Sequence, residues 1–519
     1  MKKLPIGVQD YKELITENYI YVDKTKYLYD LMTSGKFYFL SRPRRFGKSL
    51  TVSTLYYIFK GEKELFKDIY IYDKWEFKEY PIIKLDMSDN NLSSYEEFIK
   101  SLYDKINELY KEQEIEPTTD DLPTMFGNLI TGLSKKHKER VVILIDEYEA
   151  PILEHLNNKE EAEKVRRFLR EFYKKIKTKD EYIKFVFLTG ITKFTKTGVF
   201  SALNNLNDIS LDSDYSQMLG YTQEELETYF SDHIEQTSKK MGISEEELLK
   251  GLKEYYNGFS FDGEHYVYNP FSILNFFQKK KFKNYWFESG SPSFLYEYIK
   301  NRKITYEDLV KETVSAMDFS TREIEDANAN IFFTQAGYLT FKGIKKLGLK
   351  EKYILDYPNI EVKSSFSRLI LEANYGLKGL DEAENIIYEK IYNNDIDGLI
   401  EEIKKVISAI PYNLHQKEER YYHSLIFAIL AIAGLNVRAE EMTNLGRSDV
   451  VLEFNERVYI FEAKLDKSAE EAIKQIKEKK YYEKYKGKEI YLIGININSE
   501  KRNIEDYIIE KSTSLREGF

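Results

Sequence analysis

Five aliphatic residues are followed directly by two acids in the stretch Val141-Val142-Ile143-Leu144-Ile145-Asp146-Glu147. An unbroken apolar run of this length is typical of a strand that is buried on both faces, as in a parallel sheet. Similar short runs occupy residues 36–41, 81–87 and 184–189, and longer helical patterns such as 47–59 and 159–177 lie between them. This alternation predicts an α/β domain in which helices cover a parallel sheet.

A phosphate-binding motif follows the first of these strands, in Ser41-Arg42-Pro43-Arg44-Arg45-Phe46-Gly47-Lys48-Ser49. The end of this segment matches the loop G-x-x-x-x-G-K-[ST], whereas Arg42 stands in place of the first glycine. Gly47 lets backbone N–H groups approach phosphate, and Lys48 can reach the β- and γ-phosphate oxygens. Ser49 can ligate Mg²⁺ at the N-terminus of the following helix. The segment therefore predicts a site for the phosphates of a nucleotide.

The acids after the strand at 141–146 fit the same site. Asp146 can hold the Mg²⁺ shell, and Glu147 can polarise the attacking water. Thr189 ends the next strand, where its hydroxyl either senses the γ-phosphate or closes a turn. Arg45 and Phe46 are assigned to the nucleotide-binding loop. Arg45 can touch phosphate or a partner surface, but a solvated position is the commoner outcome for a basic residue in a loop.

The next part of the chain changes to a helical pattern. Residues 221–278 are predicted to form a small helical lid, in which Thr222 and Glu225 read as a capping box. Turn-forming residues at 256–263 predict one hairpin within it. Residues 285–400 carry no motif with assignable chemistry and are interpreted as a connecting helical region.

The last hundred residues predict a second α/β domain. The expected order is helix 418–432, strands 436–442, 449–454 and 458–464, helix 468–485 and strand 489–496.

Two acids of this domain are candidate metal ligands. If Asn455-Glu456 forms a two-residue turn, Asp449 faces Glu462, with Cβ atoms about 4.5 to 5.5 Å apart, close enough to share a divalent cation. Lys464 lies on the same face as Glu462. A three-residue turn would separate the acids, and a salt bridge to Lys464 is the alternative to a metal.

Composition narrows the class of protein. With 519 residues, two to four domains are expected at about 150 residues each. The absence of cysteine excludes disulfides and cysteine-ligated zinc, and a reducing cytoplasm is the expected compartment. The start turns polar too early for a signal peptide, and the longest apolar run, 425–435, is far below the roughly 20 residues that cross a bilayer, so no membrane association is expected. A net charge of −10 argues against a protein that coats nucleic acid but allows local basic surfaces.

Together, the loop at 41–49, the strand end Ile145-Asp146-Glu147-Tyr148 and the strand end Leu188-Thr189-Gly190-Ile191 resemble the AAA-ATPase-like family. Members commonly carry a C-terminal PD-(D/E)XK nuclease-like domain, and an arginine-rich loop without the first glycine is typical of the family. The resemblance spans nearly the whole chain. It implies a P-loop (ASCE/AAA-like) parallel-sheet domain at 1–215, a helical lid at 216–285, a connecting helical region at 286–404 and an α/β restriction-endonuclease-like domain at 405–519.

The resemblance also implies roles for residues on the flanking helices. A helix glutamate, here Glu419, often adds a metal ligand, and a helix glutamine, here Gln475, supports the site. Gly446-Arg447-Ser448 matches a frequent lead-in to Asp449. His423 is the only histidine near this group and no zinc-binding spacing occurs, so Mg²⁺ or Mn²⁺ is the expected metal.

The leading hypothesis is a nucleic-acid-processing enzyme in which ATP binding or hydrolysis gates Mg²⁺-dependent phosphodiester hydrolysis. DNA is the expected substrate by resemblance alone, and homo-oligomerisation is left open. One alternative is an ATP-dependent switch or scaffold whose nuclease-like domain binds a partner or nucleic acid without cleaving it. Another is that Arg42 marks a degenerate P-loop and that only the nuclease is active.

Overall fold

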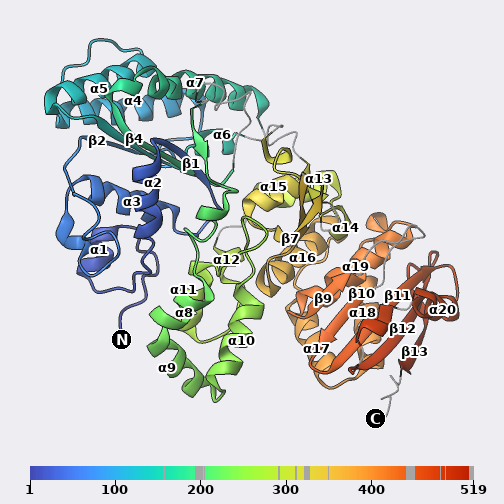
Figure 1. The fold of residues 1–519 in the computed structure, drawn as a ribbon. Helices are drawn as coiled ribbons and strands as arrows, with labels where there is room; N and C mark the ends of the chain where they lie inside the picture. The colour runs from blue at the N-terminus through green and yellow to red at the C-terminus, as the bar shows by residue number, and fades with distance from the viewer. Residues whose placement is uncertain are drawn as a thin grey trace. The chain divides into compact units, whose positions relative to one another are not determined.

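The structure is a computed structural model. It describes residues 1–155, 158–192, 203, 205–289, 293–309, 313–320, 328–348, 350–439, 450–479, 481–485 and 487–512. The chain divides into two compact units (Figure 1). The first combines Met1–Lys283 with Thr313–Pro358, and the second combines Asn284–Glu312 with Asn359–Phe519. Most of the expected connecting region at 286–404 therefore belongs to the second unit, and its segment Thr313–Pro358 belongs to the first.

A parallel sheet forms the centre of the first unit, with the strand order β2-β3-β4-β1-β5. Its strands are β1 (Phe37–Ser41), β2 (Ile82–Asp86), β3 (Val141–Asp146), β4 (Ile183–Gly190) and β5 (Asn207–Asp208). Every residue of β3 is buried, as the unbroken apolar run predicts. The α/β fold class is confirmed.

Helices cover both faces of this sheet (Figure 1). One face carries α4 (Tyr95–Glu112), α5 (Leu122–His137) and α7 (Lys159–Thr178), and the other carries α2 (Thr25–Ser34) and α3 (Lys48–Phe59), with α1 (Tyr11–Thr16) packed on α3. The short helix α6 (Ala150–Leu153) follows β3. Because the strands are parallel, the carboxyl ends of β1, β3 and β4 meet at one edge. The residues predicted for the nucleotide site follow β1 or lie at the ends of β3 and β4, so they lie at this edge.

The predicted lid is helical and comprises α8 (Gln223–Tyr229), α9 (Ser231–Met241), α10 (Glu245–Tyr256) and α11 (Pro270–Lys279). Thr222 caps α8 through the predicted capping box with Glu225. The chain between α10 and α11 folds back on itself, since Phe259 and Val267 form an antiparallel bridge. A three-stranded sheet, absent from the sequence prediction, completes the unit, with β6 (Thr313–Val314), β7 (Thr340–Leu347), β8 (Lys350–Asp356) and the helix α15 (Ala329–Ala336).

The second unit contains a mixed sheet with the order β13-β12-β11-β10-β9. Its strands are β9 (Asn436–Ala439), β10 (Val450–Phe454), β11 (Arg457–Leu465), β12 (Glu489–Asn498) and β13 (Asn503–Ser512). The helices are α12 (Tyr285–Glu288), α13 (Ser293–Arg302), α14 (Tyr306–Leu309), α16 (Ile360–Tyr375), α17 (Asp381–Tyr392), α18 (Ile396–Ser408), α19 (Glu419–Ile432) and α20 (Ala469–Lys479). The helix predicted at 468–485 ends earlier than expected, and a 3₁₀ turn occupies Tyr481–Tyr485.

The hairpin between β10 and β11 has the predicted register. Phe454 lies opposite Arg457 and Val450 lies opposite Phe461, so two residues connect the strands. Asn455 makes the turn in the left-handed region, with φ 54°. Asp449, the residue before Val450, lies outside the described residues, as do Gly446-Arg447-Ser448.

No helix in the described part of the chain is both long and apolar enough to cross a membrane.

Candidate nucleotide site and candidate metal centre

The loop between β1 and α3 makes a tight turn. Gly47 caps the N-terminus of α3 in the left-handed region, with φ 97° and ψ 20°, a conformation that glycine adopts at little cost. Arg45 is also left-handed, with φ 65°. The turn leads directly into α3, so the backbone N–H groups of its first residues are available to an anion.

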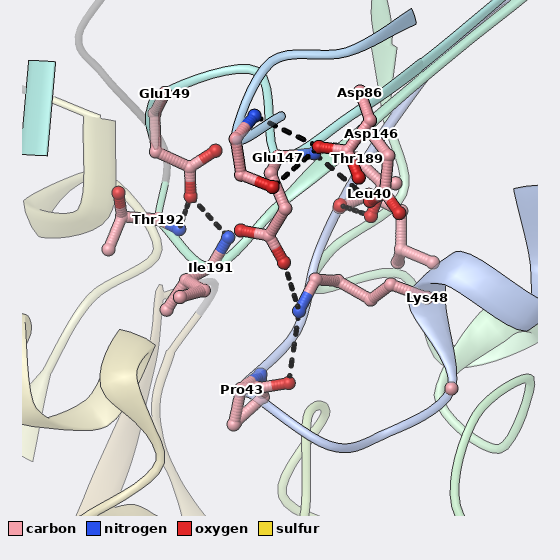
Figure 2. Close-up of polar contacts among 12 residues, drawn as sticks. Leu40, Pro43, Lys48, Asp86, Asp146, Glu147, Glu149, Thr189, Ile191 and Thr192 are labelled. Carbon is pink, nitrogen blue, oxygen red and sulfur yellow. Dashed lines mark hydrogen bonds and ion pairs between the residues drawn. The ribbon is translucent and has the colours of Figure 1, made fainter. Parts of the chain in front are cut away.

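Lys48 is buried and lies between the loop and the end of β3. Its Nζ donates to the Pro43 carbonyl oxygen at 3.3 Å and lies 3.6 Å from Oε1 of Glu147 (Figure 2). Glu147 occupies the left-handed region, with φ 48°. The geometry thus brings the predicted phosphate-binding ammonium and the predicted water-polarising acid together.

Asp146 is buried at the carboxyl end of β3 and accepts a hydrogen bond from the Ser49 hydroxyl. The pKa of Asp146 is raised to about 6, and burial is the largest cause. The neighbouring charge of Glu147 raises this pKa further, whereas the Ser49 hydrogen bond and the Lys48 charge lower it. The two predicted Mg²⁺ ligands of this site, Ser49 and Asp146, are therefore in contact.

Thr189 is fully buried on β4, where it is the register partner of Leu40 on β1. Its hydroxyl donates to the Leu40 carbonyl oxygen at 2.9 Å (Figure 2). The side chain therefore ties β4 to β1.

The turn after β3 is tied to the end of β4 by a residue that sequence reasoning did not single out. Glu149 is fully buried, and its Oε1 accepts hydrogen bonds from the backbone N–H groups of Ile191 and Thr192 (Figure 2). Burial is the largest cause that raises the pKa of Glu149, to about 8, and the charge of Glu147 adds to it. The hydrogen bonds of Glu149 therefore fix the turn after β3 against the end of β4.

Arg42, which stands at the first glycine position of the motif, is 1% exposed. Its Nη1 donates to the carbonyl oxygens of Ser41 and Ser210 at 2.9 and 2.7 Å, and its Nη2 donates to that of Tyr215 at 3.1 Å. The guanidinium also lies 4.0 Å from the centre of the Phe261 ring. Arg42 thus anchors the start of the loop to the chain after β5 and to the lid.

Two more residues of the loop contact the lid. Phe46 is 1% exposed and packs edge-to-face against Phe259 and Phe261, with ring centres 4.9 and 5.6 Å away. The guanidinium of Arg45 lies 5.1 Å from the centre of the Phe271 ring. Local pattern offers no lid partner for these two side chains, because the partners are more than two hundred residues away.

The candidate metal centre lies in the second unit. Glu462 on β11 is fully buried, and its Oε1 lies 2.8 Å from Nζ of Lys464 and accepts from Nε2 of Gln475 at 2.5 Å. The same Nζ donates to Oε1 of Glu419 at 2.8 Å. Four of the five residues predicted for this site are therefore in direct contact, and the fifth, Asp449, lies outside the described residues.

The ammonium of Lys464 lies between two carboxylates. Burial alone would lower the pKa of Lys464, but the charge of Glu462 and the hydrogen bonds to Glu419 and Glu462 raise it above its ordinary value. Lys464 is therefore charged at neutral pH.

Gln475 reaches Glu462 from α20, which lies close to the sheet at Gly494. Gly494 on β12 is the register partner of Glu462. A Cβ atom on Gly494 would lie 2.5 Å from the carbonyl oxygen of Ala469 and 2.8 Å from the Ile473 side chain, both on α20. The position therefore requires glycine.

His423 joins this group. The ligand atoms that Glu419, His423 and Glu462 offer lie within 4.8 Å of one another. Nε2 of His423 donates to the Ala463 carbonyl oxygen at 2.9 Å, which leaves Nδ1 as the nitrogen with a lone pair. The sequence signal was the spacing of Glu419 and His423, which places both on one face of a helix. These oxygen and nitrogen donors fit a divalent cation.

The fold and the two sites define a protein with a P-loop ATPase-like domain and a nuclease-like domain. Residues 5–200 match the family model described as predicted AAA-ATPase, and residues 417–507 match that of the PD-(D/E)XK nuclease superfamily. The chain is 36% identical over 532 residues to an uncharacterized protein in the vnfD 5′ region of Azotobacter chroococcum mcd 1, with 98% of this chain and 99% of that protein covered. The chain belongs to the AAA-ATPase-like family, in the form that carries a C-terminal PD-(D/E)XK domain.

Proposed function

We propose that this protein is a nucleotide-responsive, nucleic-acid-processing enzyme of the cytoplasm. ATP binding or hydrolysis in the first unit is coupled to Mg²⁺- or Mn²⁺-dependent phosphodiester hydrolysis in the second, with DNA as substrate. The observation that supports it most directly is the contact of Glu462 with both Lys464 and Gln475 beside Glu419. This group combines carboxylate oxygens, which can ligate a metal ion, with the buried ammonium of Lys464, as metal-assisted phosphodiester hydrolysis requires.

In the nuclease-like domain, Glu462, Glu419 and Asp449 are the proposed carboxylate ligands, and His423 is a nitrogen donor beside them. A bound divalent cation would supply a polarised water and neutralise charge on the phosphate. Lys464 would hold that water or stabilise the phosphorane. The three acids and Lys464 leave two negative charges, which one divalent cation would balance.

In the P-loop domain, Lys48 would exchange the Pro43 carbonyl for phosphate oxygens, because a charged acceptor makes the stronger hydrogen bond. The Ser49 and Asp146 side chains would hold Mg²⁺, and Glu147 would orient the attacking water. Arg45, Phe46, Gly47 and Thr189 remain proposed members of the nucleotide site.

A second candidate function is favoured by the position of Lys464. Its ammonium already bridges Glu419 and Glu462, so the acids are paired without a metal. A domain arranged in this way can bind nucleic acid or a partner as an ATP-dependent scaffold without cleaving it. A third reading, a P-loop that does not bind nucleotide, predicts no ATP affinity and no effect of Lys48→Ala.

The test is cleavage of plasmid and linear DNA by the full chain, with Mg²⁺ or Mn²⁺ and with or without ATP. Metal-dependent cleavage that is lost in Glu462→Ala and Lys464→Ala, and altered by ATP in wild type but not in Lys48→Ala, is expected. Glu500→Gln, an exposed acid outside the site, is the matched control and should cleave like wild type. Cleavage that survives both site variants would sink the nuclease assignment. DNA binding with no cleavage under either metal would favour the scaffold.

A further inference from the structure

The first unit contains a cavity of about 310 Å³ that no step of the proposed chemistry uses. It lies beside the start of the phosphate-binding loop and is lined by the end of β1, the chain after β5, the lid turn and the strand β7. Its volume is near the lower end of the range for small-molecule sites, about 300–1,000 Å³. The cavity is therefore large enough for part of a nucleotide.

Four phenylalanine rings belong to the cavity wall. They are Phe259 and Phe261 from the lid, Phe319, and Phe341 from β7. Phe319 and Phe341 meet edge-to-face with ring centres 5.6 Å apart, and Phe341 stacks on Tyr353 at 4.3 Å. These contacts hold the rings in place, so the wall is preformed for a flat, apolar ligand surface.

The guanidinium of Arg42 is one of the polar groups of the wall, together with Asp208 and several hydroxyl side chains. Arg42 lines the cavity, and both of its terminal nitrogens donate to backbone carbonyls. Its Nε is also buried, but that N–H has no hydrogen-bond partner in the described part of the chain.

The cavity adjoins the phosphate-binding residues. Pro43 lines it, and the carbonyl oxygen of the same residue accepts the hydrogen bond from Lys48. Pro43 therefore connects the cavity wall with the residue proposed to bind phosphate.

We infer that the cavity receives the base of the nucleotide whose phosphates Lys48 binds. A heteroaromatic base has flat faces for the phenylalanine rings, and its ring nitrogens and exocyclic groups can form hydrogen bonds with polar side chains of the wall such as Gln335. This inference rests on the proposed nucleotide site for its phosphate half. It assigns to Arg42 a second role, as part of the wall of the base site, in addition to anchoring the loop.

Calorimetry on the full chain tests this assignment with two probes, ATP and inorganic tripolyphosphate, which lacks a base and a sugar. ATP should bind at least tenfold more tightly than tripolyphosphate. Ala316→Trp, at an exposed position that lines the cavity, should weaken ATP binding at least tenfold and leave tripolyphosphate binding within twofold. Gln335→Trp, at another wall position, should act in the same way.

Met317→Trp is the matched control, because Met317 is 72% exposed and does not line the cavity. It should bind both probes like wild type. Equal affinity for ATP and tripolyphosphate, both lost in Lys48→Ala, would overturn the base site while leaving the phosphate site intact. Unchanged ATP binding in both tryptophan variants would also overturn it. Binding of neither probe would remove the phosphate site and the base site together.

Discussion

The ammonium of Lys464 lies 2.8 Å from Oε1 of Glu462, a carboxylate with no exposed surface. Removing one member of a buried ion pair leaves the other charge uncompensated, which typically costs about 3–5 kcal/mol. Lys464→Ala should therefore lower the melting temperature of the metal-free protein. Millimolar Mn²⁺ should recover part of the loss, because the cation takes the place of the ammonium beside the acids.

Lys474→Ala, which removes an exposed ion pair with Glu478, is the control and should change stability by about 1 kcal/mol or less. A Lys464→Ala protein as stable as wild type would show that the ion pair between Lys464 and Glu462 does not stabilise the fold.

His423 should give the metal centre a preference for Mn²⁺ over Mg²⁺, because imidazole is a good ligand for transition metals and a poor one for Mg²⁺. His423→Asn should weaken Mn²⁺ binding about 10- to 100-fold, the usual cost of disturbing a metal site, and change Mg²⁺ binding much less. Titration calorimetry of the full chain measures both affinities. His137→Asn, an exposed histidine at the end of α5, is the control. Equal losses for the two metals would mean that His423 only supports the fold.

Asp146 should make the nucleotide-free protein less stable as the pH rises. Burial raises the pKa of Asp146 in the folded chain to about 6, above its ordinary value of 3.8. Its protonated form therefore favours folding at low pH, and this contribution is lost as the pH rises through about 6. Asp146→Asn, which is neutral at every pH, should melt at a higher temperature than wild type at pH 7.5, by an amount equivalent to roughly 2–3 kcal/mol. The difference should shrink at pH 5, and a constant difference would contradict the assignment.

Glu149 should contribute to stability through the two backbone N–H groups that it accepts from. Glu149→Ala leaves the N–H groups of Ile191 and Thr192 without this acceptor, at a cost of about 1–3 kcal/mol for a buried group. Glu149→Gln keeps an acceptor oxygen in place and should retain more than half of the lost stability. Thermal melts of the two variants give the comparison. Equal melting temperatures for the Ala and Gln variants would show that an acceptor at residue 149 does not contribute to stability.

The sequence predicts the parts of this protein that depend on local pattern. The apolar run Val141–Asp146 identifies a buried strand, and the two-residue turn at Asn455 sets the register of β10 and β11. Glu419 and Gln475, taken from the family resemblance, also lie at the centre with Glu462. The order of elements was therefore enough to collect most of the nuclease-like site.

Other features depend on partners that are distant in the sequence. From the sequence alone, Arg42 is only a departure from the glycine of the P-loop motif. Its anchoring contacts cannot be predicted, because its acceptors at Ser210 and Tyr215 and its ring partner Phe261 belong to later segments. The sequence does not predict the strand β13, since Asn503–Ser512 forms neither an unbroken apolar run nor a strict alternation of apolar and polar residues. Tertiary contacts override local pattern at such positions.

The close approach of α20 to Gly494 has a consequence for engineering the metal centre. Gly494 carries no functional group, yet it sets the separation between helix and sheet across which Gln475 reaches Glu462. Replacing this glycine with alanine would push the helix outward and withdraw the amide from the acid. The size of the side chain at residue 494 therefore offers a way to weaken the hydrogen bond between Gln475 and Glu462 without replacing any charged residue of the centre.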